Sequence, residues 1–60
     1  GNGTWFDWYE SGNLREQGEL IHGLEEGPWN YFLETGALLR VVVYDRGRVQ
    51  EVDGDDTIVT

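Results

Sequence analysis

The feature that most constrains the fold of this chain is an internal repeat with a period of 24 residues. When residues 3–26 are laid over residues 27–50, six positions are identical, and two of the matched residues are tryptophans. A fixed period of this length is typical of repeat architectures, in which one unit alone cannot bury its apolar face. The identical pairs are Gly3/Gly27, Trp5/Trp29, Glu10/Glu34, Gly12/Gly36, Leu14/Leu38 and Gly23/Gly47.

Within each unit the pattern predicts a strand, a turn and a return strand. The first segment of each unit is short and rich in aromatic residues, which favours a strand over a helix. A Ser-Gly or Thr-Gly pair then marks the turn, and an apolar segment follows. Glycines interrupt every window in which a helix could form. The expected strands are 4–10, 14–21, 29–34 and 37–45.

Three glycine positions predict local backbone geometry. Gly12 suits the left-handed position of a tight hairpin turn, where a Cβ atom would clash. Gly18 lies inside a return strand and indicates a bulge or a close backbone approach. Residues 23–27, which begin and end with glycine, are expected to form a longer connection between the units. Pro28 is then expected as the first residue of a strand.

The residues after the second unit allow two interpretations. Residues 48–52 are expected to form a fifth strand, followed by a hairpin turn at Asp53-Gly54 and a sixth strand over 57–60. Alternatively, residues 51–60 form an acidic C-terminal tail. The predicted fold is therefore all-β: an antiparallel meander of two β-hairpin repeats, 3–26 and 27–50, in one twisted sheet with a possible fifth strand.

The first unit resembles a known repeat. Its segment Gly-Thr-Trp-Phe-Asp-Trp-Tyr-Glu-Ser-Gly-Asn-Leu, residues 3–14, resembles the MORN-repeat variant found in tandem in bacterial proteins of the YwqK-family antitoxin type. Residues 27–38 match again, except that Leu33 replaces the tyrosine, and Glu51 stands where the partner glycine of Gly47 is expected. This second departure suggests that the array ends there. The resemblance implies stacked β-hairpins used for protein contact or scaffolding, and it implies no catalysis.

Composition restricts the partners. The 60 residues include 12 carboxylates against four arginines and no lysine, which gives a formal net charge of -8. Phosphate binding requires cations, so nucleic acid and anionic membranes are not expected as partners. No apolar run approaches the length of a membrane span. The composition favours an acidic folded module whose protein partner is basic.

Possible catalytic and ligand-binding patterns are weak. Glu10 and Glu34 could form a glycosidase-like carboxylate pair, but a small meander offers little cleft. Ser11 and His22 would have to converge with an aspartate, which nothing in their spacing predicts. Residues 53–56 resemble part of a calcium loop but lack its closing glutamate, and residues 23–27 lack a phosphate-loop lysine. We therefore expect no enzymatic activity, no metal and no cofactor.

The aromatic residues suggest an interaction surface. Alternation along a strand places Trp5 on one face and both Phe6 and Trp8 on the other, so both faces carry large apolar side chains. One interpretation buries both faces in a strongly twisted sheet. The other leaves one face free for a partner, with Phe6, Trp8 and Tyr31 as candidate binding residues. The expected core consists of Trp5, Trp8, Leu14, Leu20, Trp29, Phe32, Leu38, Val42 and Tyr44.

Two functions follow as hypotheses. The first is a non-enzymatic protein-interaction or scaffold module, with self-association through the unpaired sheet edges as a further possibility. The second is a small acidic antitoxin-like or inhibitor protein that blocks a basic surface of its partner.

Overall fold

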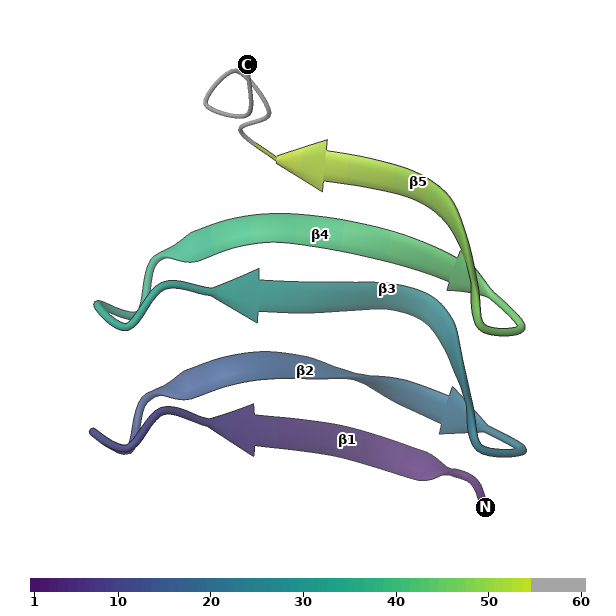
Figure 1. The fold of residues 1–60 in the computed structure, drawn as a ribbon, viewed down its shortest axis with the longest axis horizontal. Coiled ribbons are helices and arrows are strands. Elements are labelled where there is room, and N and C mark those ends of the chain that lie inside the picture. Colours follow the sequence, from purple (N-terminus) through teal and green to yellow (C-terminus); the bar gives the residue numbers. More distant parts are fainter. Residues whose placement is uncertain (55–60) are drawn as a thin grey trace.

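The computed structural model describes residues 1–54, and these form one five-stranded antiparallel sheet (Figure 1). The strands follow one another in the sheet in chain order, so the topology is a simple meander. The predicted all-β meander and its fifth strand are therefore confirmed. The strands are β1 (Gly3–Trp8), β2 (Leu14–Ile21), β3 (Leu24–Phe32), β4 (Leu38–Asp45) and β5 (Arg48–Gly54).

The strand pairing recurs with an offset of 24 residues. All six partner pairs between β1 and β2 have a counterpart between β3 and β4 when 24 is added to each residue number. Trp5 pairs with Gly18, for example, and Trp29 pairs with Val42. The register break that follows Asp7 on β1 likewise reappears after Tyr31 on β3. Equivalent residues of the two hairpins therefore occupy equivalent places in the sheet.

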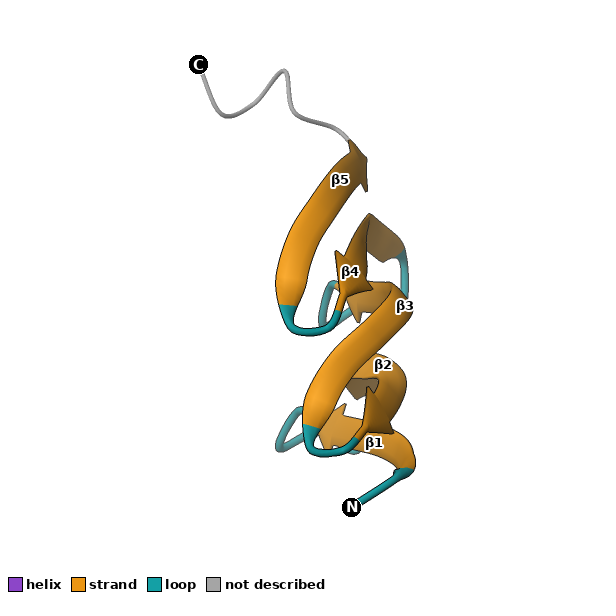
Figure 2. Ribbon diagram, turned by 90° about the vertical axis from the view of Figure 1, so that its right-hand side faces the viewer, coloured by secondary structure: helices purple, strands orange, loops and turns teal. Residues whose placement is uncertain are grey.

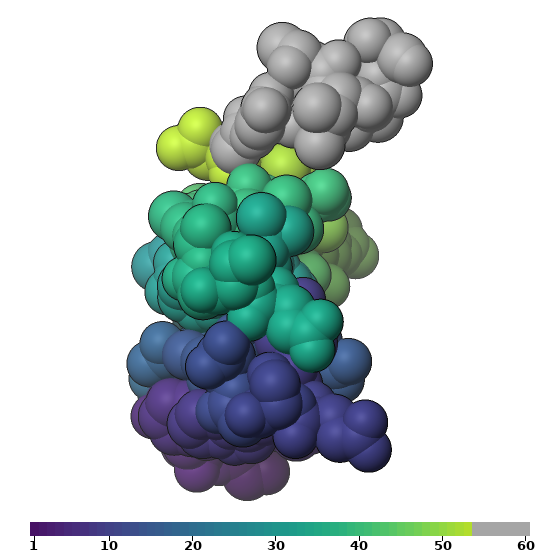
Figure 3. All heavy atoms as spheres, turned by 90° about the vertical axis from the view of Figure 1, so that its left-hand side faces the viewer, coloured from purple at the N-terminus to yellow at the C-terminus, as the bar shows by residue number. Residues whose placement is uncertain are grey.

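The loops that close the two hairpins are built in the same way. In the first loop the Tyr9 amide donates to the Asn13 carbonyl at 2.8 Å, and the Gly12 amide donates to the Tyr9 carbonyl at 2.9 Å. The loop over 33–37 has both bonds at the equivalent residues. Gly12 and Gly36 have φ angles of 98° and 100°, which an L-residue rarely adopts. The predicted left-handed glycine turns are confirmed, and Figure 3 shows the two loops end-on, one above the other.

Two-residue turns at the opposite side of the sheet replace the expected longer connection over 23–27. His22 and Gly23 join β2 to β3, and Arg46 and Gly47 join β4 to β5 (Figure 2). His22 and Arg46 have φ angles of 53° and 52°, so a non-glycine residue takes the first left-handed position of each turn. The residue type of His22 does not predict a left-handed conformation, so a tight turn at this position was not expected. As a result, β3 begins five residues earlier than predicted.

Each two-residue turn is also bonded to a residue far back in the chain. The His22 amide donates to Oδ1 of Asn2 at 2.6 Å, and the Arg46 amide donates to Oε1 of Glu26 at 3.0 Å. The glycine amide that follows donates to the carbonyl of the residue just before that one in the chain, so Gly23 donates to Gly1 and Gly47 donates to Glu25. Each of these two turns is therefore stabilised by a side chain that lies outside the pair of strands it connects.

Pro28 lies inside β3 and not at its beginning. The pairing of β2 with β3 is irregular here, because no residue of β2 is the register partner of residues 27–29. On the other side Pro28 pairs with Val43 of β4. The missing N–H of the proline falls at this irregularity, so no regular hydrogen bond of the sheet is lost there.

The C-terminal part of the prediction is corrected in one detail. Asp53 and Gly54 belong to β5 and pair with Val41 and Arg40, so they do not form the expected turn. The strand predicted over 57–60 lies outside the described residues. At the other end of the chain, β1 stops at Trp8, two residues before the predicted limit.

The sheet is a single layer, and this decides where its core lies. The described molecule measures 31 × 29 × 12 Å, and the shortest dimension leaves no space for a second layer. Trp29 on the central strand is 3% exposed, and its partner Val42 is also buried. Trp5 on the edge strand is 45% exposed although it belongs to the same row of side chains across the sheet.

The predicted core is therefore too large. Trp29 and Val42 are confirmed as buried, whereas three other members of that core are exposed because nothing covers the faces or edges of a one-layer sheet. The exposed members are Trp5, Trp8 and Leu38. The remaining four are only partly buried: Leu14, Leu20, Phe32 and Tyr44. Burial of both faces is also wrong, because Phe6 and Trp8 on the second face are about half exposed.

Trp29 packs directly on the backbone of Gly18. A Cβ atom at Gly18 would lie 2.0 Å from Cδ2 of the indole, so only glycine fits beneath the ring. The indole Nε1 donates to the Glu19 carbonyl at 3.1 Å, and the ring meets Tyr44 edge-on at a centroid distance of 5.9 Å. The close backbone approach predicted at Gly18 is confirmed, and it joins the two hairpins.

We expect Trp29→Ala to lower the free energy of unfolding by about 3–5 kcal/mol, because it empties the centre of the buried cluster of the described residues. Trp5→Ala is the matched control and should cost only about 1 kcal/mol, because its ring is already half exposed. Urea unfolding followed by circular dichroism would measure both. Equal losses in the two variants would contradict the assignment of the core.

We expect Gly18→Ala to destabilise the chain by about 1–3 kcal/mol, because the added methyl group displaces the Trp29 ring. The neighbouring Gln17→Ala should change the stability by less than about 0.5 kcal/mol. Thermal unfolding of both variants tests this expectation. A Gly18→Ala protein as stable as the parent would show that the indole does not need the glycine.

Candidate interaction surface

Three large aromatic side chains are exposed on one edge strand of the sheet. Trp5, Phe6 and Trp8 all belong to β1, and they are between 45% and 54% exposed. Among the described residues β1 pairs only with β2, so its outer backbone edge is also free. We call these three side chains and that free edge the aromatic edge. Exposed aromatic clusters of this kind are typical of binding surfaces.

Phe6 and Trp8 form a continuous apolar surface on one face of β1. Their ring centroids are 6.0 Å apart with an interplanar angle of 20°, so the rings are stacked. This agrees with the alternation predicted for the strand. Trp5 lies on the opposite face, in the row that contains Gly18 and Trp29. A partner that reached both faces of β1 would therefore contact all three rings.

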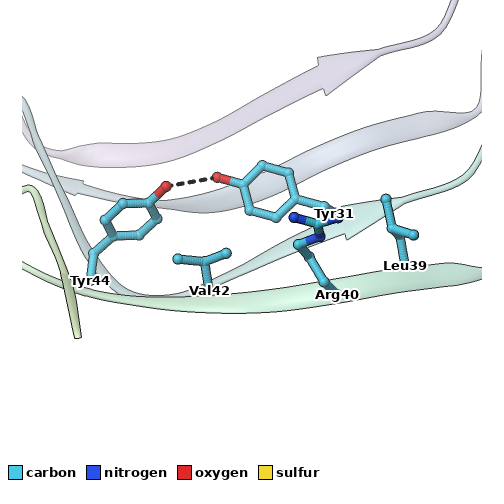
Figure 4. A pocket seen from close by; sticks show the side chains of 5 residues that line it. All are labelled: Tyr31, Leu39, Arg40, Val42 and Tyr44. Carbon is cyan, nitrogen blue, oxygen red and sulfur yellow. Dashed lines mark hydrogen bonds between the residues drawn. The ribbon is translucent and has the colours of Figure 1, made fainter. Parts of the chain in front are cut away.

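Tyr31, the third predicted binding residue, is not part of this surface. It lies on β3, in the central part of the sheet, and it is only partly exposed. Its hydroxyl shares a hydrogen bond of 3.0 Å with the hydroxyl of Tyr44 (Figure 4). The structure brings Phe6 and Trp8 together and separates Tyr31 from them.

The two tyrosines cover a shallow hollow of about 290 Å³ on the Trp29 face of the sheet. Val42 of β4 also lines the hollow, and Arg40 is the register partner of Tyr31 on the neighbouring strand (Figure 4). The hollow is lined by Tyr31, Leu39, Arg40, Val42 and Tyr44. Burial raises the pKa of Tyr31 well above its usual value, and the hydrogen bond to Tyr44 acts in the same direction.

Trp5 was missed as a candidate because its match with Trp29 suggested a core residue. The two tryptophans have the same place in the strand and equivalent partners on the next strand. They differ in exposure, 45% against 3%, because Trp29 has Gly18 of a preceding strand beneath its ring, whereas no strand precedes β1 among the described residues. The sequence signal that could have found Trp5 is its position in the first predicted strand, which lies at an edge of the described sheet.

Charged residues surround the aromatic edge. Asp7 of β1 pairs with Glu16 of β2 and also forms an ion pair with Arg15. The Arg15 guanidinium lies 5.6 Å from the centre of the Tyr9 ring. Glu19 accepts a hydrogen bond from the Thr4 hydroxyl at 2.9 Å. Three carboxylates and one guanidinium therefore lie along this side of the sheet, so its local charge is negative.

The opposite edge of the described sheet is different in character. β5 exposes Val49 and Val52 but no aromatic residue, and it carries the charged residues Arg48, Glu51 and Asp53. Charged side chains on an edge strand oppose pairing with another chain. The only charged residue of β1 is Asp7, which is already paired. The two edges are therefore not equivalent as binding surfaces.

The residues of the weaker catalytic patterns lie in loops and turns of the described part of the chain. Glu10 and Glu34 are both exposed in loops. Ser11 and His22 lie beyond opposite ends of β2, whose eight residues span about 26 Å. No group of three or more His, Asp or Glu residues that could hold a metal is found over residues 1–54. Asp55 and Asp56 of the calcium-like pattern lie outside the described residues.

The chain matches no family model, no curated protein and no solved structure. The resemblance to MORN repeats therefore stays a prediction carried by the sequence pattern. Within residues 1–54 there is no helix that could cross a membrane.

We expect the free energy of unfolding to fall more steeply between pH 9 and pH 11 in the parent chain than in Tyr31→Phe. The raised pKa means that the folded state keeps this proton after the unfolded state has begun to lose it near pH 10, so alkali favours unfolding. The chain has no lysine, which leaves this pH range to tyrosine side chains. Urea titrations at several pH values would show the difference, and parallel pH profiles would contradict it.

Proposed function

We propose that this chain is a non-enzymatic protein-interaction module that binds a basic partner segment through its aromatic edge. The observation that carries the proposal is the exposure of Trp5, Phe6 and Trp8 on a single edge strand. Aromatic side chains offer a large contact area at a low cost in conformational entropy, which is why they dominate binding surfaces. The resemblance to MORN-like repeats supports the same class of function.

The charge of the chain supports a basic partner. The formal net charge is -8, and the carboxylates of Asp7, Glu16 and Glu19 lie beside the aromatic edge. A negative field accelerates the encounter with a positively charged surface and disfavours acidic partners. Lysine and arginine side chains of the partner could also lie over the exposed faces of Trp8 and Phe6. Nucleic acid and anionic membranes are poor partners for the same electrostatic reason.

An antitoxin-like or inhibitor role is the second candidate. The high negative charge on a small folded unit favours it, because such a surface can cover a basic active site or nucleic-acid-binding surface. Both roles use the same edge and the same charges. They differ in outcome, because an inhibitor abolishes an activity of its partner and a scaffold module leaves that activity intact.

The proposal is tested by selecting a random peptide library displayed on phage against the immobilised chain. We expect the enriched peptides to carry net positive charge and to bind less tightly as the salt concentration rises. Their binding should fall at least roughly tenfold in the double variant Phe6→Ser/Trp8→Ser, because one lost hot-spot side chain costs more than about 1 kcal/mol.

Leu33→Ser is the matched control, because Leu33 is similarly exposed but lies in the loop after β3. This variant should bind the selected peptides as the parent does. Circular dichroism should show that all variants remain folded. Failure to enrich any peptide, or equal binding to the parent and the double variant, would contradict the proposal.

A further inference from the structure

The position of Trp5 implies what kind of strand the aromatic edge accepts. Trp29 is the residue 24 positions later, and its burial comes from the strand that precedes it, β2. β2 supplies a glycine beneath the indole and a carbonyl that accepts from its Nε1. Trp5 has neither a preceding strand nor an indole hydrogen bond among the described residues.

We propose that the outer edge of β1 binds an extended antiparallel segment of a basic partner protein, with a glycine beneath the Trp5 ring. This inference rests on the proposed function and specifies how its partner is recognised. The segment takes the place that β2 takes against β3, so the backbone supplies hydrogen bonds and the glycine supplies specificity. Any larger residue would place a Cβ atom against the indole, as the geometry at Gly18 demonstrates.

The pairing of β2 with β3 gives the register of the bound segment. Glu16 pairs with Tyr31 and Gln17 pairs with Asn30, which correspond to Asp7 and Phe6 of β1 after subtraction of 24. The partner residue two positions before the glycine therefore lies opposite Asp7. The partner residue two positions after the glycine corresponds to Leu20, which pairs with Glu25, so it lies opposite Gly1.

Charge then selects the residue opposite Asp7. On β2 that position is Glu16, which would place a third carboxylate beside Asp7 and Glu16 in the same cross-strand row. Like charges directly opposite one another destabilise a sheet, whereas opposite charges stabilise it. A lysine or arginine is therefore favoured there. The expected pattern of the partner is a basic residue, any residue, glycine, any residue and an apolar residue.

A second copy of the chain fits this edge less well. β2 is the strand with the required glycine, and it is already paired on both sides. Two chains of net charge -8 also repel each other, and a second β1 that placed its Gly3 beneath Trp5 would set Gly1, and not a basic residue, opposite Asp7. The net charge and the charge of the residue opposite Asp7 both favour a different, basic chain.

The test uses an eight-residue peptide that copies residues 14–21 with the change Glu16→Lys and with both ends blocked. Its control is the same peptide with the further change Gly18→Val. Valine is the better strand former, so strand propensity alone would make the control bind more tightly. We expect instead that the control binds roughly tenfold more weakly or worse, because its side chain collides with Trp5.

Nuclear magnetic resonance titration of the full chain would locate the binding site. We expect the glycine peptide to shift the Trp5 indole N–H and the amides of β1, and to leave the amides of β5 unchanged. In the Trp5→Ala chain the two peptides should bind with similar affinity, because the ring that excludes valine is gone. If the difference between the two peptides disappears in this variant, the contact between the ring and the glycine is its cause, and a general loss of affinity is not.

Three outcomes would overturn the inference. The first is equal binding of the two peptides by the parent chain, and the second is the absence of any shift at Trp5. The third is self-association through β1 in sedimentation experiments that the glycine peptide does not reverse, which would make a second copy the occupant. Phage-selected peptides that require Phe6 and Trp8 but show no glycine preference would overturn this inference alone and leave the proposed function standing.

Discussion

The packing of one indole ring on one glycine is the contact on which the rest of this sheet depends. Adjacent hairpins of a one-layer meander have no second layer to hold them, so their union relies on contacts between neighbouring strands. Trp29 supplies this union by lying on Gly18, by donating a hydrogen bond to the next carbonyl and by meeting Tyr44 edge-on. An isolated hairpin of β1 and β2 would be marginally stable in water at best, and this contact adds to the pairing of β2 with β3.

The same contact explains why the two ends of the described sheet have different chemistry. Trp29 is buried against the strand before it, and no described strand precedes β1, so Trp5 stays exposed at the outer side of the first hairpin. The position 24 residues after Trp29 is Asp53, so β5 carries no corresponding ring. The sheet therefore has one apolar aromatic edge and one charged edge. This asymmetry favours binding at one side only and opposes indefinite end-to-end association.

Much of the fold could be predicted from the sequence because the repeat doubles every local signal. Gly12 and Gly36 mark equivalent left-handed turns, and β2 was predicted at its observed limits. The prediction failed where the backbone geometry does not follow from the residue type. His22 takes a left-handed conformation without being glycine, so the tight turn before β3 could not be predicted.

The extent of the core was also overestimated, because alternation shows that two residues share a face but not that anything covers that face. The candidate site was half predicted: Phe6 and Trp8 are adjacent, Tyr31 is elsewhere, and Trp5 was assigned to the interior.

The long hydrogen bonds that close the two-residue turns have a consequence for the order of folding. Each turn is held by Asn2 or Glu26, a residue 20 positions earlier in the chain, and this residue reaches its place only when the earlier strand is already aligned. All strand pairs connect neighbours in the chain, which favours rapid folding from local contacts. Each of these turns can therefore form its full set of hydrogen bonds only after the strand that precedes its hairpin is in register. The sheet should therefore assemble directionally from its N-terminal strand, and a chain that emerges from the ribosome would present its strands in the order in which they are needed.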